Sequence, residues 1–199
     1  MAGPVILASA SPTRLALMRD AGIDVQSDPA AVDEAAVKTA LRADGATVAD
    51  VAEALAELKA TQVSRRHPGS LVIGADQMLE CGDVWFDKPP DPAHAKAQLL
   101  ALRDRTHSLV SCAVAVRDAA RLWHHTDQAR LTMRRFSDRF LDDYLAMVGD
   151  EAMRSVGAYR LEGLGAQLFA GVDGDYFTIL GLPLLPLLDW LRAQRVLAQ

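Results

Sequence analysis

Short apolar runs alternate with segments of helical periodicity in the first half of this chain. The run at 4–8 predicts a buried strand, and Ser11 and Pro12 after it are typical of a helix start. Apolar residues recur every three or four positions over 48–66, which predicts an amphipathic helix, and the run at 71–75 predicts a second buried strand. Strands interleaved with helices are typical of an α/β fold.

The second half of the chain departs from strict alternation, because strands are predicted in succession there. Long strands are expected at 108–116 and 122–133, and a final pair at 166–172 and 175–180. Residues 29–45 are mixed in character and are expected to include loop. Consecutive strands favour a mixed sheet over a purely parallel one. We therefore expect an α/β fold with a bent mixed β-sheet flanked by helices, in two lobes around a cleft.

Composition excludes several classes of protein. Half of the 199 residues are hydrophobic, which is too many for an intrinsically disordered chain. The formal net charge is -5 and basic residues do not cluster, so no duplex nucleic acid is expected as a partner. Cys81 and Cys112 give no disulfide framework, which favours a cytoplasmic protein. The most apolar tract, 179–191, is short and interrupted by prolines, so no membrane partner is expected.

An arginine in the first turn of the predicted N-terminal helix is a candidate for a binding role. Arg14 shares a helix face with the apolar Met18, and its charge opposes the helix dipole. A strand-to-helix junction offers free N–H groups to an anion, and Ser9 and Ser11 add hydroxyl donors. A bound phosphate would offset both the cost of a charge on an apolar helix face and the cost of a cation at the positive end of the helix dipole. The alternative is a helix cap with an arginine that reaches solvent, and these residues alone favour that alternative.

A lysine and an aspartate also stand out against their surroundings. Lys59 lies in the apolar stripe of the 48–66 helix, where it reaches solvent, pairs with a carboxylate, or binds phosphate as a point charge. Asp76 directly follows the strand at 71–75. A carboxylate there often faces the ligand crevice of an α/β protein, where it can bind a metal ion or accept a proton from water. The alternative is an ordinary turn residue.

Weaker candidates are an acidic pair and a lysine that precedes a proline. Asp33 and Glu34 form the acidic pair, with a solvated surface as the alternative. Lys88 precedes Pro89, which holds the lysine backbone extended and can aim its charge, although a plain loop is commoner. The chain has no GxxxxGK[ST] or GxGxxG motif, so phosphate-binding-loop and Rossmann nucleotide sites are not supported.

The order of these motifs resembles the Maf family of nucleoside triphosphate pyrophosphatases over nearly the whole chain. The segment Leu7-Ala8-Ser9-Ala10-Ser11-Pro12, followed by Arg14, is similar to the N-terminal signature of that family. Further segments that resemble family motifs are, in order, Val32-Asp33-Glu34, Lys59-Ala60, Ile73-Gly74-Ala75-Asp76, Lys88-Pro89, Arg105-Thr106-His107, Gly157-Ala158-Tyr159, Glu162-Gly163 and Gly181-Leu182-Pro183. One such segment would be a weak signal, but this many in order is a specific one.

The resemblance implies a single Maf-like domain over 1–199, with a Maf/ITPase-like fold whose two lobes surround a nucleotide cleft. It also implies a hydrolase that depends on a divalent cation (Mg²⁺, Mn²⁺ or Co²⁺) and often forms homodimers. The reaction cleaves the bond between the α- and β-phosphates of a nucleoside triphosphate and gives a nucleoside monophosphate and pyrophosphate.

The resemblance further implies roles for individual residues. Asp76 matches the proton acceptor of the family, and Glu34 with Asp76 is the expected metal pair. Lys59 and Lys88 are expected to act in catalysis near the triphosphate. The expected substrate-binding residues are Ser9, Ser11, Thr13, Arg14, Gln77 and Glu162.

Three positions bear on the identity of the substrate. Gln77 and Glu162 resemble the branch that acts on 7-methyl-GTP, whereas members similar to the dTTP/UTP pyrophosphatases have threonine and glutamine there. Thr13 matches neither branch well, because many members have arginine at this position. 7-Methyl-GTP is therefore the favoured substrate, and a dTTP/UTP-type pyrophosphatase is the alternative.

Two other functions stay open on the sequence alone. One is a nucleotide-binding regulator of cell division without turnover, and the other is a small α/β interaction module. Asp76, Lys59 and Lys88 favour the enzyme, because a pure binder needs no proton acceptor. An interaction module would leave Lys59 and Arg14 on apolar faces without an explanation.

Overall fold

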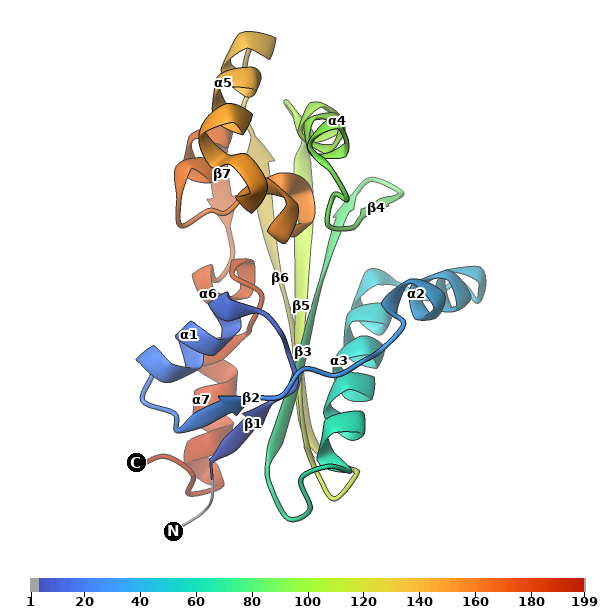
Figure 1. The fold of residues 1–199 in the computed structure, drawn as a ribbon, viewed down its shortest axis with the longest axis vertical. Coiled ribbons are helices and arrows are strands. Elements are labelled where there is room, and N and C mark those ends of the chain that lie inside the picture. The colour runs from blue at the N-terminus through green and yellow to red at the C-terminus, as the bar shows by residue number, and fades with distance from the viewer. Residues whose placement is uncertain (1–3, 199) are drawn as a thin grey trace. The chain divides into compact units, whose positions relative to one another are not determined.

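The computed structural model describes residues 4–198, which divide into two compact units. Unit 1 comprises residues 4–77, 110–127 and 175–198, and unit 2 comprises 78–109 and 128–174. The described strands form a mixed seven-stranded sheet in the order β2-β1-β3-β5-β6-β7, with β4 paired to β3. The predicted α/β fold, a mixed sheet flanked by helices, is thereby confirmed (Figure 1). The nucleotide cleft and the single domain over 1–199 stay predictions.

Unit 1 begins with a parallel arrangement of strands. β1 (Val5–Leu7) pairs in parallel with β2 (Val25–Ser27) and with β3 (Val72–Cys81). β5 (Thr106–Arg117) and β6 (Ala120–Met133) are neighbours in the sheet and, like β3, contribute residues to both units. The helices of this unit are α1 (Pro12–Asp20), α2 (Glu34–Ala43), α3 (Val48–Ser64), α6 (Tyr176–Ile179) and α7 (Leu184–Ala193).

The alternation of side chains along β3 gives unit 1 two packed faces. Ile73 and Ala75 pack into a core with apolar side chains of α1 and α7. Gly74, between them, faces α3, where a Cβ atom would lie 2.0 Å from the carbonyl oxygen of Ala56. Figure 1 shows α3 on one side of β3, with α1 and α7 on the other. α3 therefore packs directly on the strand that carries Asp76.

Unit 2 is built around two antiparallel strand pairs. β4 (Val84–Phe86) forms an antiparallel pair with β3 across the turn at Gly82-Asp83, and β7 (Phe169–Asp173) forms an antiparallel pair with β6. The helices of this unit are α4 (Pro92–Leu102) and α5 (Asp138–Val148), with 3₁₀ turns at Gly149–Arg154, Val156–Ala158 and Leu164–Leu168.

The predicted final strand pair is wrong. Residues 175–180 contain the helix α6, because the Asp175 carboxylate accepts a hydrogen bond from the N–H of Thr178 at 2.9 Å and caps a helical turn. The strand expected to begin at Ala166 begins at Phe169 instead, after a 3₁₀ turn. Residues 29–45, in which we expected loop, also contain α2, whose N-cap is Asp33.

A buried histidine in unit 2 makes stability sensitive to acid. His107 is only 2% exposed, and its Nε2 lies 2.7 Å from the hydroxyl oxygen of Tyr159. Burial lowers the pKa of His107 from 6.5 to about 4. The unfolded chain binds a proton as the pH falls through 6.5, whereas the folded protein does not until about pH 4. Stability is therefore lost as the pH falls across this window.

We expect His107→Gln to reduce this sensitivity. Between pH 7 and pH 5 the free energy of unfolding should fall by about 2 kcal/mol more in the unmodified protein than in the variant. Glutamine keeps a hydrogen-bonding group toward Tyr159 but does not titrate in this range. Urea unfolding at both pH values measures the difference, with His94→Gln, at an exposed histidine, as the control. If the free energy of unfolding depends on pH equally in His107→Gln and in the unmodified protein, His107 is not the source of the acid sensitivity.

Candidate active site

Three of the predicted site residues meet in an ion-paired cluster in unit 1. The Nζ of Lys59 lies 2.6 Å from Asp76 Oδ1 and 2.7 Å from Glu34 Oε1. The lysine comes from α3, the aspartate from β3, and the glutamate from the first residue of α2. Lys59 and Asp76 are buried, and Glu34 is half-buried. The lysine on the apolar stripe therefore pairs with carboxylates rather than reaching solvent.

A close helix-to-strand contact brings this cluster together. A Cβ atom on Gly74 would lie 2.0 Å from the Ala56 carbonyl oxygen and 2.9 Å from the Ala60 Cβ, so only glycine fits here. Lys59 lies between these two alanines along α3, and Asp76 lies two residues after Gly74 on the same face of β3. Asp76 was expected to follow its strand, but β3 continues to Cys81, so the carboxylate lies inside the strand.

One carboxylate oxygen of the cluster is buried without a hydrogen bond. Asp76 Oδ1 accepts a hydrogen bond from Lys59, whereas Oδ2 accepts none from any described residue. Buried polar atoms usually have a partner, so this oxygen is available to a metal ion or to water. Asp76 and Glu34 fit a Mg²⁺-type cation, which needs only one or two carboxylates when water and substrate phosphates complete its shell. Within residues 4–198, no group of three or more His, Cys, Asp or Glu could hold a metal ion.

The guanidinium of Arg14 is held beside this cluster by backbone carbonyl groups. Its Nε donates to Gly181 O at 2.7 Å, and its Nη1 donates to Ala75 O at 2.8 Å and to Ser9 Oγ at 3.2 Å. Burial lowers the pKa of Arg14, and the negative charges of the neighbouring Asp76 and Glu34 oppose part of this shift. Protein acceptors therefore hold this guanidinium in place, and the Arg14 side chain is half-buried.

Ser9 and Ser11 shape the junction between β1 and α1. The Oγ of Ser9 accepts a hydrogen bond from the N–H of Ser11 at 3.2 Å. Ser11 is the N-cap of α1, and its Oγ accepts from the N–H of Arg14 at 3.3 Å. Thr13, in the same first turn, is half-buried. These hydroxyl groups therefore hold the helix start that carries Arg14, and their contact with a substrate stays a prediction.

Sequence reasoning missed several groups that complete this region. The carbonyl oxygens of Ala75 and Gly181 hold Arg14, but any residue type supplies a carbonyl, so the sequence carries no signal for them. Gln77 faces away from Asp76, and its amide contacts Ser111 and the α6 residue Thr178. Neither of these partners belongs to a motif that we singled out.

Comparison with known proteins decides the family. The family model for Maf-like proteins matches residues 4–194. The chain belongs to this family. It is 62% identical to a nucleoside triphosphate pyrophosphatase of Paramagnetospirillum magneticum, over 94% of this chain and 96% of the relative. It is 54% identical to a nucleoside triphosphate pyrophosphatase of Granulibacter bethesdensis, over 97% and 98%. It is 53% identical to a 7-methyl-GTP pyrophosphatase of Mesorhizobium japonicum, over 96% of each chain.

Two predicted site residues of this Maf-like chain lie in unit 2. Lys88 follows β4 and is exposed. The Oε1 of Glu162 accepts a hydrogen bond from Arg160 Nε at 2.9 Å, and this bond raises the pKa of Arg160. The roles of Lys88 in catalysis and of Glu162 in substrate binding stay predictions.

Among the described helices, none is long and apolar enough to cross a membrane.

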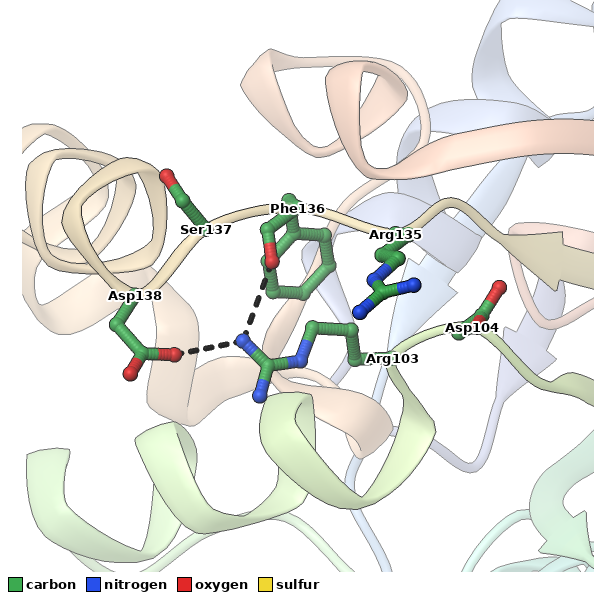
Figure 2. Close-up of a pocket in the computed structure, with 6 residues that line it drawn as sticks. All are labelled: Arg103, Asp104, Arg135, Phe136, Ser137 and Asp138. Carbon is green, nitrogen blue, oxygen red and sulfur yellow. Dashed lines mark hydrogen bonds and ion pairs between the residues drawn. The ribbon is translucent and has the colours of Figure 1, made fainter.

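A cavity of about 570 Å³ in unit 2 offers a different surface (Figure 2). Arg103, one of the residues that line the cavity, donates hydrogen bonds to the Phe136 carbonyl oxygen at 3.1 Å and to Asp138 Oδ1 at 2.6 Å, so its positive charge is already paired. The full lining is Arg103, Asp104, Arg135, Phe136, Ser137 and Asp138, with two arginines balanced by two aspartates. None of the predicted site residues lines this cavity, and the charge balance gives it no preference for a triphosphate.

Proposed function

We propose that this protein is a nucleoside triphosphate pyrophosphatase. It cleaves the α–β phosphate bond of its substrate and releases a nucleoside monophosphate and pyrophosphate, with 7-methyl-GTP as the favoured substrate. The observation that carries the proposal is the cluster of Asp76, Lys59 and Glu34, with a buried carboxylate oxygen that has no hydrogen-bond partner among the described residues. The names of its relatives, which are 50–62% identical, support the same reaction.

Asp76 has the geometry of a general base in this reaction. Lys59 donates a hydrogen bond to Asp76 Oδ1. Asp76 Oδ2 has no hydrogen-bond partner among the described residues, and in this proposal it accepts a proton from the attacking water. A divalent cation at Asp76 and Glu34 would neutralise phosphate charge when it is bound. Arg14 and Lys59 supply positive charges that bind phosphate oxygens in this proposal, and Lys88 is proposed as a further catalytic residue.

A panel of nucleotides tests the proposal. The purified protein is incubated with 7-methyl-GTP, GTP, UTP, dTTP and ATP, each with Mg²⁺, Mn²⁺ or Co²⁺ and with a chelator. We expect equal amounts of pyrophosphate and nucleoside monophosphate, and no product with the chelator. Release of orthophosphate and a nucleoside diphosphate would place the cleavage at another bond. Nucleotide binding without any product would favour the alternative of a non-catalytic regulator.

Two further parts of the proposal concern the protein as a whole. We propose that it forms a homodimer and that it acts in the cytoplasm. Light scattering during size-exclusion chromatography measures the mass in solution, and a value near that of one 21.5 kDa chain would overturn the dimer. Fractionation of the native cells, with the protein detected by an antibody, tests the location.

Glu162 is proposed to set the base preference. The Watson–Crick edge of guanine presents two adjacent donors, N1–H and N2–H₂, which one carboxylate can accept together. A 7-methylated guanine also carries positive charge, which favours a carboxylate further. Uracil and thymine present a donor flanked by acceptors, which an amide matches better. We therefore expect Glu162→Gln to lower the ratio of activity on 7-methyl-GTP to activity on UTP by about 10-fold or more.

The matched control for this prediction is Glu151→Gln. Glu151 also pairs with Arg160, through Oε2 and Nη1 at 3.1 Å, so the control disturbs the same arginine without changing Glu162. We expect the activity ratio of this control to equal that of the unmodified protein. If Glu162→Gln also keeps the activity ratio of the unmodified protein, residues other than Glu162 recognise the base. If the ratio falls equally in Glu162→Gln and Glu151→Gln, the effect comes from Arg160.

A further inference from the structure

We infer that Gln62 and Arg66 are positioning residues, which hold the loop between β2 and α2 and thereby place the Glu34 carboxylate for a divalent cation. This loop comprises residues 28–33 and ends directly before Glu34, the first residue of α2 (Figure 1). The inference rests on the proposed function, because it takes Glu34 as one of the two carboxylate ligands of the cation.

Burial of apolar side chains does not fix the position of Glu34. None of the residues 26–47 is buried, although this stretch includes the whole of α2. Helices in proteins are normally stabilised by the apolar face that they bury. The ion pair with Lys59 is also a weak anchor, because the Glu34 side chain is 44% exposed and exposed ion pairs contribute little. The position of Glu34 therefore depends on the contacts of the loop that precedes it.

Gln62 holds this loop three residues before Glu34. Gln62 and Lys59 are three residues apart on α3, so their side chains share one face of the helix. Gln62 Nε2 donates to the carbonyl oxygen of Ala31 at 3.1 Å. Its Oε1 has no hydrogen-bond partner among the described residues, so a substitution that removes the amide breaks no other hydrogen bond there.

Arg66, in the turn after α3, holds the start of the loop. Its Nε and Nη2 donate to the two carboxylate oxygens of Asp28 at 3.1 and 2.8 Å, and Nη2 also donates to Pro29 O at 3.2 Å. The Nε2 of His67 lies 2.7 Å from Asp28 Oδ2. Hydrogen bonds from Arg66 and His67 lower the pKa of Asp28, so its carboxylate is charged at neutral pH.

These contacts set the loop antiparallel to α3. From the start of the loop to its end, the partners step back from Arg66 through Gln62 to Lys59. This order fixes where along α3 the next helix begins, and so where its first residue, Glu34, lies. Loss of either contact should let Glu34 move away from Asp76, although both carboxylates are still present.

The variants Gln62→Met and Arg66→Met test the inference, since methionine keeps a long apolar stem and removes the donors. We expect each to weaken Mn²⁺ binding to the nucleotide-free protein by about 10-fold, measured by electron paramagnetic resonance of the free ion. Loss of a positive charge alone would favour a cation, so weaker binding in Arg66→Met reports position and not charge. Unchanged Mn²⁺ affinity in either variant would overturn the role of that residue.

The metal dependence of the rate separates positioning from a general loss of structure. The Mn²⁺ concentration that gives half of the maximal rate of pyrophosphate release should rise by about 10-fold in both variants. The rate at saturating Mn²⁺ should return to that of the unmodified protein, because added metal compensates for a misplaced ligand but does not repair a damaged fold. A rate that stays low at saturating Mn²⁺ would overturn the inference.

Two comparisons provide the controls. Arg65→Met removes the neighbouring positive charge, and within residues 4–198 no hydrogen bond or ion pair joins Arg65 to the loop, so Mn²⁺ affinity should not weaken. In a Glu34→Gln background, Gln62→Met should have no further effect on Mn²⁺ affinity, because it acts through Glu34. A further loss in the double variant would show that Gln62 acts in another way.

Because Mn²⁺ binding is measured without nucleotide, the inference and the proposed function can fail separately. Weakened Mn²⁺ binding in the two variants of a protein that releases no pyrophosphate would uphold the inference and overturn the proposed function. Absence of Mn²⁺ binding in the unmodified protein would overturn the inference. Should a methionine variant fail to fold, Arg66→Lys and Gln62→Asn are smaller changes that break the same contacts and should weaken Mn²⁺ binding in the same direction.

Discussion

Asp76→Asn is expected to lower turnover by about 10²- to 10⁴-fold while the protein stays folded. An amide cannot take a proton from the attacking water, and it is a poorer ligand for a divalent cation. The fold should survive because Lys59, which loses one carboxylate, keeps its second partner, Glu34, at 2.7 Å. The buried ammonium group is therefore not left without a counter-charge.

Initial rates of pyrophosphate release, together with thermal unfolding of the same samples, measure both parts of this expectation. The control is Asp118→Asn, a carboxylate in the same unit that accepts one hydrogen bond from the N–H of Gly69 at 2.7 Å. Asparagine tolerates the backbone at this position, where φ is 50°, so rate and stability should both be retained. Near-normal turnover by folded Asp76→Asn would remove Asp76 from the role of general base.

Charges on apolar faces were the most informative part of the sequence. Lys59 interrupts the stripe of an amphipathic helix, and the structure places it between Asp76 and Glu34. Arg14 opposes a helix dipole, and the structure surrounds its guanidinium with acceptors. A buried charge is tolerable only with partners, so an anomaly in the pattern marks a cluster even before the partners are known.

The partners themselves could be predicted only when they are side chains. Glu34 and Asp76 belong to residue types that bind cations, so the sequence could suggest them. The carbonyl groups that hold Arg14 could not be suggested in this way, because every residue has one. The turn at α6 was also missed, because a single capping bond from Asp175 decides between a short helix and a strand over six residues. A helical period in the hydrophobic pattern can be recognised only over segments longer than these six residues.

The packing of α3 on β3 leads to the largest expected effect on stability, that of Gly74→Ala. The added Cβ would lie 2.0 Å from the carbonyl oxygen of Ala56, which is backbone and cannot rotate away. Overpacking by one methyl group commonly costs 1–3 kcal/mol, and a clash with helix backbone should reach or exceed about 3 kcal/mol. That loss corresponds to a fall in Tm of about 6–12 °C for a chain of this size.

The same substitution should also lower activity, because α3 can only relieve the clash by moving away from β3. Lys59 lies between Ala56 and Ala60, the two residues that contact Gly74, so its ammonium should move away from Asp76 with the helix. Thermal unfolding and pyrophosphate release measure the two effects. Gly171→Ala is the control, since a Cβ at that position of β7 meets no atom within 4 Å and should change Tm little. If Gly74→Ala keeps both the Tm and the turnover of the unmodified protein, the close contact between α3 and β3 is not what holds the lysine at the carboxylate.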